Sequence, residues 1–492
     1  MSSRLISGSM LYDVVKCPHR VYLDKHGEQA LRDEPSAFIE MLWEKGCIHE
    51  GQIVEGMVGP LVNVADCDPE EKEAKTREAI EAGAEVIYSG RIVFDDLVGE
   101  PDLLKRSGDG YRAGDIKSGA GLEGEVGDGK LKKHYALQVA HYTNILNQIG
   151  KGDGTRNAFI IDRDGNEVLY PLDDPQGPRT PTSYWTLYLE KLEFVRGLVN
   201  QRISSRSGLC SHCKECHWQT ACKRELINAD DLTLICELGP PKRDVLYPVI
   251  PTVKALSEID PSIYFKDNKK TIFDGIGPDS LIKFRDRANL LAIPGSKPFA
   301  RQPLAFPNVE IEVFFDLEDD PFRDFCYLHG FLTRTNSAET FAYFYADEPD
   351  PAAEEQAFAQ AWNLISNLPE SHAIYYYSTH ERTYYKKLAT RYPRVCSVEA
   401  VEALFEGPKT IDLLFEVVRP FTEWPTYDRS VKTLAKYLGF EWRDQNPSGA
   451  ASIEWFQQWL DTNDPAVKQR ILDYNEDDCR AMRVLLDGLR AI

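Results

Sequence analysis

The chain has 492 residues, of which 42% are hydrophobic and 27% charged, and its formal net charge is −21 at pH 7. This length allows roughly two to four domains, and the composition excludes a disordered or collagen-like chain. The acidic balance disfavours a protein that coats duplex DNA, because phosphate contacts need lysine and arginine. No apolar run is long enough for a membrane span, and Met1–Arg4 open no export signal, so we expect a cytoplasmic protein without a membrane partner.

Three regions follow one another along the chain. Residues 1–235 alternate helical and strand patterns, residues 236–308 are interrupted by glycine and proline, and residues 309–492 begin a second α/β pattern. We therefore predict an α/β protein with two α/β domains joined by a helical connector. Within the first domain, Gly119–Gly129 is glycine-rich and acidic, which is typical of a loop.

The first candidate site lies in an apolar, strand-rich stretch that contains Asp102, Asp115 and Lys117. Asp115 and Lys117 are two residues apart, so on a strand both side chains point to the same face. Two carboxylates that converge on one point bind a hard cation such as Mg²⁺ or Mn²⁺. A lysine beside them stabilises developing negative charge, and together these groups are suited to metal-assisted phosphodiester hydrolysis.

Two flanking segments extend this pattern. Gly46–Glu50 precedes it with His49 and Glu50, and Gln138 and Tyr142 follow it at i and i+4, on one helix face. The four elements in this order resemble the PD-(D/E)XK nucleases, and more narrowly their RecB-like branch. The resemblance implies a restriction-endonuclease-like fold in which Asp102, Asp115 and either Glu50 or His49 hold the metal, with Lys117, Gln138 and Tyr142 as catalytic residues. An isolated Asp-x-Lys is common, so the prediction depends on all four elements.

A cysteine pattern follows this region. Eleven cysteines, four of them within residues 210–222, favour a metal site in a reducing compartment over a disulfide framework. One cysteine before the core and three after it resemble the iron–sulfur nucleases, namely the CRISPR-associated exonucleases and the AddAB helicase–nuclease. The resemblance implies a [4Fe-4S] cluster that joins the two ends of the domain. The alternative is Zn²⁺, including an all-local site with Cys210 in place of Cys17. The cluster ligands implied are Cys17, Cys213, Cys216 and Cys222.

The connector contains Gly275-Ile276-Gly277 just before a predicted helix. This pattern resembles the hairpin of a helix-hairpin-helix element, whose glycines let backbone N–H groups face a phosphate. Lys283, and with it Arg285 and Arg287, would add positive charge towards DNA. A plain turn is the alternative, because a lone Gly-x-Gly is a weak signal.

The second candidate site combines a strand and a late helix. Asp316 and Glu318 lie on one face of an apolar strand, and Tyr474 and Asp478 share a helix face at i and i+4. This pair of motifs resembles the DEDD exonucleases of the RNase H-like fold, in their tyrosine subtype. The resemblance implies a two-metal site in which Tyr474 orients the attacking water.

This second site departs from the family at one position. The asparagine that normally precedes the middle acid is absent, so Glu381 is the expected acid and Asp412 the fallback. We therefore expect an intact fold with weak or conditional exonuclease activity, and rank this site below the first. The metal ligands implied by the resemblance are Asp316, Glu318, Glu381 and Asp478.

Nearly the whole chain thus resembles a family of RecB-like nucleases with a DEDD domain. The resemblance implies a metal-dependent nuclease on DNA, preferring single strands or ends, in repair, processing or defence. The alternatives are an RNA-processing exonuclease through the C-terminal domain and a non-catalytic nucleic-acid-binding iron–sulfur protein. No G-x4-G-K-[ST] loop is present, so a helicase or other repair or defence partner would be a separate protein. Basic stretches such as Lys130–His134 offset the acidic charge locally.

Overall fold

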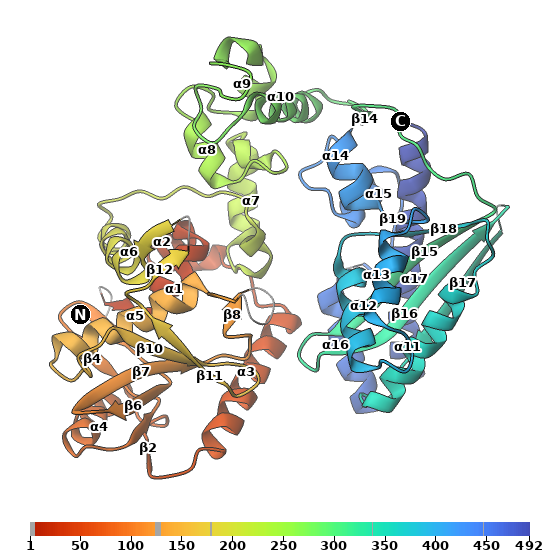
Figure 1. Ribbon diagram of the computed structural model, residues 1–492. Coiled ribbons are helices and arrows are strands. Elements are labelled where there is room, and N and C mark those ends of the chain that lie inside the picture. Colours follow the sequence, from red (N-terminus) through yellow and green to blue (C-terminus); the bar gives the residue numbers. More distant parts are fainter. Residues whose placement is uncertain (1–4, 124–128, 178–179, 337, 446) are drawn as a thin grey trace. The chain divides into compact units, whose positions relative to one another are not determined.

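The structure is a computed structural model that describes residues 5–123, 129–177, 180–336, 338–445 and 447–492. The chain forms two compact units (Figure 1): Met1–Ser207 with Ser211–Glu225, and Gly208–Cys210 with Leu226–Ile492. Both units mix helices and sheets, so the chain is α/β. The prediction on an export signal concerns Met1–Arg4, and part of the predicted loop is residues 124–128. Both segments lie outside the described residues.

The first unit is built on a mixed six-stranded sheet. Strands β6 and β7 form an antiparallel hairpin, and β10 runs parallel to β7 with Ile160 opposite Asp115. The order in the sheet is β11-β10-β7-β6-β3-β2. The strands are β2 (Leu61–Asn63), β3 (Val86–Tyr88), β6 (Leu103–Ser107), β7 (Gly110–Ile116), β10 (Asn157–Ile161) and β11 (Glu167–Pro171).

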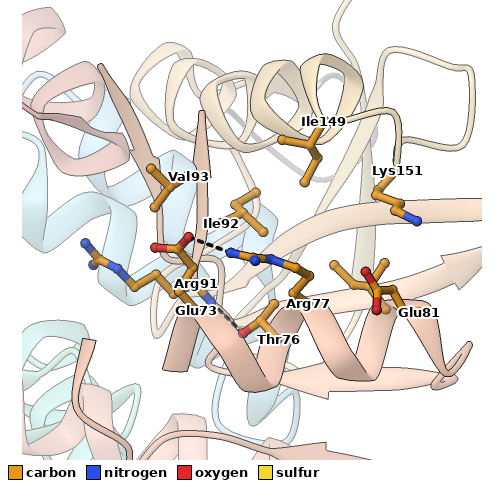
Figure 2. A pocket seen from close by; sticks show the side chains of 10 residues that line it. Glu73, Thr76, Arg77, Glu81, Arg91, Ile92, Val93, Ile149 and Lys151 are labelled. Carbon is orange, nitrogen blue, oxygen red and sulfur yellow. Dashed lines mark hydrogen bonds and ion pairs between the residues drawn. The ribbon is translucent and has the colours of Figure 1, made fainter. Parts of the chain in front are cut away.

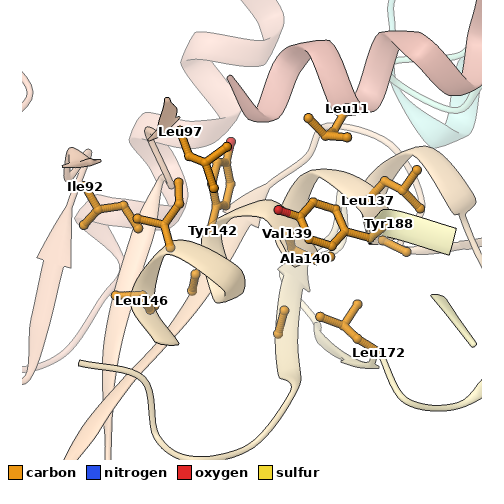
Figure 3. Packing of buried hydrophobic residues seen from close by; sticks show 14 of the residues in the cluster. Leu11, Ile92, Leu97, Leu137, Val139, Ala140, Tyr142, Leu146, Leu172 and Tyr188 are labelled. Atoms are coloured by element: carbon orange, nitrogen blue, oxygen red, sulfur yellow. The ribbon is translucent and has the colours of Figure 1, made fainter. Parts of the chain in front are cut away.

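Helix α5 (Lys133–Gln148) is the centre of this unit. It packs on β7 and β10 with one side and on α1 and α6 with the other, so that eleven consecutive or nearly consecutive residues are buried. Figure 3 shows Leu137, Val139, Tyr142 and Leu146 of this helix among Leu11 and Leu97 from neighbouring elements. The other helices are α1 (Gly8–Lys16), α2 (Pro18–His26), α3 (Ala37–Glu55), α4 (Pro69–Glu81), α6 (Tyr184–Val199) and α7 (Gln219–Asn228).

Short elements complete the first unit. Strands β1 and β4 pair with β5 in a three-stranded sheet, and β8–β9 and β12–β13 form two small ribbons. Their bounds are β1 (Ile6–Ser7), β4 (Ile92–Phe94), β5 (Leu97–Gly99), β8 (Leu122–Glu123), β9 (Lys130–Leu131), β12 (Pro175–Gly177) and β13 (Thr180–Ser183). Two 3-10 helices cover Gln29–Leu31 and Ser211–Glu215.

The connector folds as part of the second unit, around its own apolar cluster of residues such as Leu238, Leu256 and Phe284. Its helix α10 begins directly after Gly277, where the sequence predicts a helix start. Strand β14 pairs with β20 and so ties the end of the connector to the C-terminal domain. The elements are α8 (Pro240–Leu246), α9 (Val253–Ser257), α10 (Pro278–Ala292), β14 (Phe299–Ala300), β20 (Thr422–Glu423) and 3-10 helices at Leu232–Leu234 and Pro261–Tyr264.

The C-terminal domain contains a five-stranded sheet of order β17-β16-β15-β18-β19. Strands β15, β16 and β17 form an antiparallel meander, whereas β18 and β19 run parallel to β15. The strands are β15 (Ile311–Asp320), β16 (Phe325–Thr335), β17 (Ala338–Tyr345), β18 (His372–Tyr376) and β19 (Thr410–Asp412).

Helices cover both faces of this sheet (Figure 1), and β15 alternates between them. Val313, Phe315 and Leu317 pack towards α11 and α12, while Phe314 packs towards α17. Because side chains alternate along a strand, Asp316 and Glu318 share the α17 face with Phe314. The helices are α11 (Pro351–Ser366), α12 (His380–Arg391), α13 (Val398–Glu406), a π-helix (Leu413–Val418), α14 (Arg419–Phe421), α15 (Val431–Tyr437), α16 (Gly449–Thr462) and α17 (Pro465–Arg490).

Candidate active sites

The strand β15 and the helix α17 bring three carboxylates together in the C-terminal domain. One ligand atom each from Asp316, Glu318 and Asp478 lies within 4.8 Å of the other two. Within the described ranges, no other group of three His, Cys, Asp or Glu side chains comes this close. Oxygen donors in such an arrangement fit a hard divalent cation.

Three side chains hold this carboxylate group in place. Asn475 donates from Nδ2 to Asp316 Oδ2 over 2.7 Å, and Trp442 donates from its indole Nε1 to Asp478 Oδ1 over 2.7 Å. Lys432 lies 3.4 Å from Asp478 Oδ2 and donates to the Tyr474 hydroxyl over 2.6 Å. Tyr474 is buried, so its hydroxyl is fixed rather than mobile.

Asn475 can reach Asp316 because residue 330 on the neighbouring strand is a glycine. Gly330 pairs with Asp316 across β15 and β16. A Cβ atom at Gly330 would lie 1.7 Å from Asn475 Oδ1, which no side chain tolerates. The missing side chain therefore forms the space in which the asparagine amide sits.

The electrostatics of this group favour a bound cation. Burial and the charge of Asp478 raise the pKa of Glu318 to about 8, and the same two causes raise the pKa of Asp316. Burial and Asp478 also raise the pKa of Tyr474, which is therefore a neutral phenol at pH 7. Lys432 supplies one positive charge against several negative ones, so Mg²⁺ or Mn²⁺ would relieve the remaining repulsion.

Glu381 lies beside this group but not within it. It is buried in the first turn of α12, and its charge contributes to the raised pKa of Asp316. Its Oε2 is buried and has no hydrogen-bond partner among the described residues. The fallback acid, Asp412, instead caps the π-helix by accepting from the backbone N–H groups of Leu414 and Phe415.

In the first unit, Asp102 and Asp115 lie next to each other at the edge of the hairpin β6–β7. Asp115 Oδ1 accepts from the backbone N–H of Asp102 at 3.3 Å, and Asp102 Oδ2 accepts from that of Ile116 at 2.7 Å. Lys117 Nζ lies 2.8 Å from Asp115 Oδ2. Burial lowers the pKa of Lys117, but the nearby carboxylates outweigh that effect and raise it, so the ammonium stays charged.

The remaining predicted residues of this site surround the pair. Glu50 accepts from the Tyr88 hydroxyl at 2.9 Å, and its charge helps to raise the pKa of Asp102, after burial and Asp115. His49, by contrast, directs Nε2 to the backbone carbonyl of Asp162 at 3.2 Å. These contacts favour Glu50 over His49 as the third ligand.

Gln138 and Tyr142 meet on the buried face of α5. Gln138 donates from Nε2 to the Tyr142 hydroxyl at 3.0 Å, while its Oε1 is buried and lacks a partner among the described residues. Burial raises the pKa of Tyr142, and the charges of Asp115 and Asp102 raise it further, which places its ring near the two carboxylates.

Three of the four predicted cluster cysteines come together in the first unit. Burial and then the neighbouring thiols of Cys216 and Cys17 raise the pKa of Cys222 to about 12. Cys213 lies in the 3-10 helix just before Cys216, whose backbone N–H donates to the Cys213 carbonyl. Thiolates of this kind fit either Zn²⁺ or an iron–sulfur cluster.

The connector turn has part of its predicted geometry. Gly275 has φ +69°, a conformation that favours glycine, and Gly277 is the N-cap of α10. Lys283 lies on that helix. Arg287, however, does not face solvent as predicted: it is buried and pairs with Glu423 at 2.7 Å, so it contributes to the fold instead of to DNA contact.

A pocket between α4, β4 and the end of α5 (Figure 2) involves none of the predicted site residues. In it, Arg77 pairs with Glu73 at 3.0 Å, and the Arg91 backbone N–H donates to the Thr76 hydroxyl. Lys151 also lines this pocket.

The comparison with family models bears on the second unit. Residues 313–490 match the model of the RNase_H superfamily. The C-terminal domain is therefore RNase H-like. Its sheet order and the position of Asp316 and Asp478 on the first strand and last helix agree with that match. No curated protein is similar enough to the chain to count as a match. No helix in the described part of the chain is long and apolar enough to cross a membrane.

Sequence reasoning missed four residues of the RNase H-like site. Lys432 and Trp442 come from α15 and the segment after it, and no motif marks either one. Asn475 stands directly after Tyr474, outside the i, i+4 pair that marks the helix face. Gly330 could have been noticed as a glycine inside a strand, which often marks a close approach of another group.

Proposed function

We propose that this protein is a metal-dependent nuclease that hydrolyses phosphodiester bonds of DNA, at single strands or ends. The RNase_H superfamily match supports nuclease-type activity in general. The observation that carries the proposal is the convergence of Asp316, Glu318 and Asp478 within 4.8 Å, next to Tyr474. These are the groups that metal-assisted phosphoryl chemistry requires.

The residues of the RNase H-like site divide the work. A Mg²⁺ or Mn²⁺ ion held by the three carboxylates would polarise the scissile phosphate and lower the pKa of an attacking water. Tyr474 is a neutral phenol whose oxygen accepts from Lys432, so its own proton remains available to orient a nucleophile. Lys432 places a positive charge where negative charge develops on the phosphate. Asn475 keeps Asp316 in one orientation.

The first unit supports a second active site of the PD-(D/E)XK type. Glu50 comes from α3, Asp102 and Asp115 from the hairpin β6–β7, and Tyr142 from α5, which packs on that hairpin's sheet. Lys117 stays charged beside Asp115, where it can stabilise a phosphate. In this site, Glu50, Asp102 and Asp115 would bind Mg²⁺ or Mn²⁺. Gln138 would orient Tyr142.

Cleavage assays with single-site variants test the proposal. Asp115→Ala and Asp316→Ala, separately and together, are compared on end-labelled single-stranded DNA, duplex DNA and RNA, with Mg²⁺, Mn²⁺ or EDTA. We expect cleavage by the wild-type protein, partial loss in each variant and complete loss in the double variant. Asp109→Ala in the β6–β7 turn and Asp461→Ala on α16 are exposed controls that should retain activity. Full activity in the double variant would overturn the proposal.

An RNA-processing exonuclease is the second candidate, because the family match lies wholly in the RNase H-like domain. It predicts RNA trimming that Asp316→Ala abolishes and Asp115→Ala leaves unchanged. A protein that binds strands but cleaves none under any condition would instead be a binding protein with degenerate sites. In either case, a separate helicase or other repair or defence partner would have to supply the strand.

For the cysteines we propose a [4Fe-4S] cluster on Cys17, Cys213, Cys216 and Cys222. The cluster would close a loop that spans almost the whole first unit and so restrict its unfolded state. Anaerobically purified protein should be brown and contain iron, and Cys17→Ser or Cys222→Ser should lose both properties. Cys67→Ser, at a distant cysteine, serves as the control. Colourless protein with stoichiometric zinc would assign the site to Zn²⁺.

A further inference from the structure

A group of lysine and aromatic side chains lies where the end of α1 meets the start of α5. We name it the lysine–tyrosine cluster; it consists of Tyr12, Lys16, Lys132, Lys133, His134 and Tyr135. Lys16 Nζ lies 4.5 Å from the Tyr12 ring centroid, and Lys132 Nζ lies 5.0 Å from that of Tyr135. The two tyrosine rings stack at 6.1 Å, and His134 meets both of them edge-on at 4.8 and 4.6 Å.

The lysines of this cluster make no ion pair among the described residues, whereas some other lysines of the unit do. Lys75 and Lys105 pair with glutamates at 2.8 and 2.6 Å. Lys16, Lys132 and Lys133 form no ion pair with any acidic group among the described residues. In a chain of net charge −21, three such lysines side by side are a concentrated positive surface.

Keeping these cations together costs free energy. Burial, and after it the charges of Lys16 and Lys132, lower the pKa of His134 to about 4, so this ring is neutral at pH 7 and adds no positive charge. Lys132 and Lys133 also stand at the N-terminal end of α5, where the helix dipole opposes positive charge. Burial lowers the pKa of Lys132 more than the charge of Glu123 raises it, and Glu123 forms no ion pair with it.

The cluster is continuous with the candidate metal site of the first unit. Lys117 Nζ lies 5.9 Å from the centroid of the Tyr135 ring, whose other neighbour is Lys132. Lys117 in turn contacts Asp115 at 2.8 Å. The Tyr135 ring and Lys117 thus connect the cluster with the carboxylates.

We propose that the lysine–tyrosine cluster binds single-stranded nucleic acid and guides it into the Asp102–Asp115 site. This inference deepens the proposed function and rests on it. The lysines neutralise backbone phosphates, and the half-buried rings of Tyr12 and His134 offer their exposed parts to unpaired bases. A duplex keeps its bases stacked inside, so it cannot use those rings. The surface thus explains how an acidic chain binds a polyanion: it uses one small cationic track.

Binding measured without cleavage tests this inference. The full chain is titrated against a fluorescein-labelled oligothymidylate and a duplex of equal charge, in EDTA and over a range of salt concentrations. We expect the triple variant Lys16→Ala/Lys132→Ala/Lys133→Ala to reduce the slope of log K against log salt by about 2, at about 0.7 per phosphate contact on single strands. Tyr12→Ala should weaken single-strand binding about tenfold and leave duplex binding unchanged, whereas Tyr12→Phe keeps the ring and should bind normally.

The matched control is Lys72→Ala/Lys151→Ala/Lys191→Ala, which removes the same charge from α4, from beyond the C-terminal end of α5 and from α6. Its salt slope should equal that of the wild-type protein. An unchanged slope in the cluster variant, or an equal loss in the control, would overturn the inference even if Asp115-dependent cleavage is found. Conversely, a cluster-dependent slope without Asp115-dependent cleavage would uphold the binding surface and reject the nuclease assignment of that site. Thermal unfolding of both triple variants verifies that they are folded.

Discussion

Lys432 contacts two side chains of the RNase H-like site, although no sequence motif marks it. Its ammonium contacts Tyr474 at 2.6 Å and Asp478 at 3.4 Å, so it sets the position of the phenol and partly neutralises the acids. Its ring contact with Tyr474, at 4.7 Å from the centroid, restricts both side chains further.

We expect Lys432→Met to lower cleavage by the RNase H-like site about 100-fold, because one preorganised charge near a reacting phosphate contributes about that much. Lys432→Arg keeps the charge and should recover part of the loss in kcat with little change in KM. The rates are measured in an Asp115→Ala background, so that only this site contributes. Lys436→Met, one turn further along α15 over Trp442, is the control. Equal rates for Lys432→Met and Lys436→Met would contradict the assignment.

Glu318 gives the metal-free domain a pH-dependent stability. Its pKa of about 8 in the folded state lies above the ordinary glutamate pKa of 4.5, so the folded state binds more protons than the unfolded state between these values. Stability must then fall as pH rises from about 4.5 to about 8, by on the order of a few kcal/mol at most. Glu318→Gln should flatten this dependence of Tm in EDTA, and Mn²⁺ should restore wild-type stability at pH 8. A wild-type Tm that rises over this range in EDTA, with Glu318→Gln rising less, would reverse the assigned sign.

At the scale of elements, Glu423 on β20 anchors the connector to the RNase H-like domain. This buried carboxylate pairs with Arg287 of α10 at 2.7 Å, with Arg301 at 2.9 Å and with Arg429 at 2.6 Å. Removing one partner of a buried ion pair leaves the others desolvated and uncompensated.

Glu423→Gln should therefore destabilise the second unit by about 3–5 kcal/mol. Asp286→Asn breaks the more exposed pair with Arg301 and should cost about 1 kcal/mol or less. Urea unfolding of the full chain compares the two variants. If their midpoints coincide, the connector is held by apolar packing alone.

The strand β15 and the helix α17 of the second unit could be predicted from sequence because their signals are local. The apolar run around Asp316 predicts a strand, and the i, i+4 spacing of Tyr474 and Asp478 predicts a helix face. The positions of Gly330 and Lys432 could not be predicted, because both depend on which strand or helix becomes a neighbour. Arg287 was misjudged for the same reason: its burial follows from a glutamate 136 positions away.

For the molecule as a whole, sequence predicted two α/β regions and an RNase H-like C-terminal domain, which the family match supports for residues 313–490. The net charge averages over the chain, whereas charge acts over about 8–10 Å at physiological salt, so the three lysines of the lysine–tyrosine cluster set a positive local field. The basic stretch Lys130–His134 was visible in sequence, but its link to Tyr12 and Lys16 required the fold.

The path of the chain between the two units determines whether they can be separated. Residues 208–210 belong to the second unit although residues on both sides of them belong to the first. The backbone N–H of Leu209 donates to the Thr233 hydroxyl there. No single cut can therefore separate the two units cleanly. A break after Ser207 removes Cys213, Cys216 and Cys222 from the first unit, and a break after Glu225 removes 208–210 from the second. We therefore expect that the two units cannot be produced as separate, complete fragments by one cut.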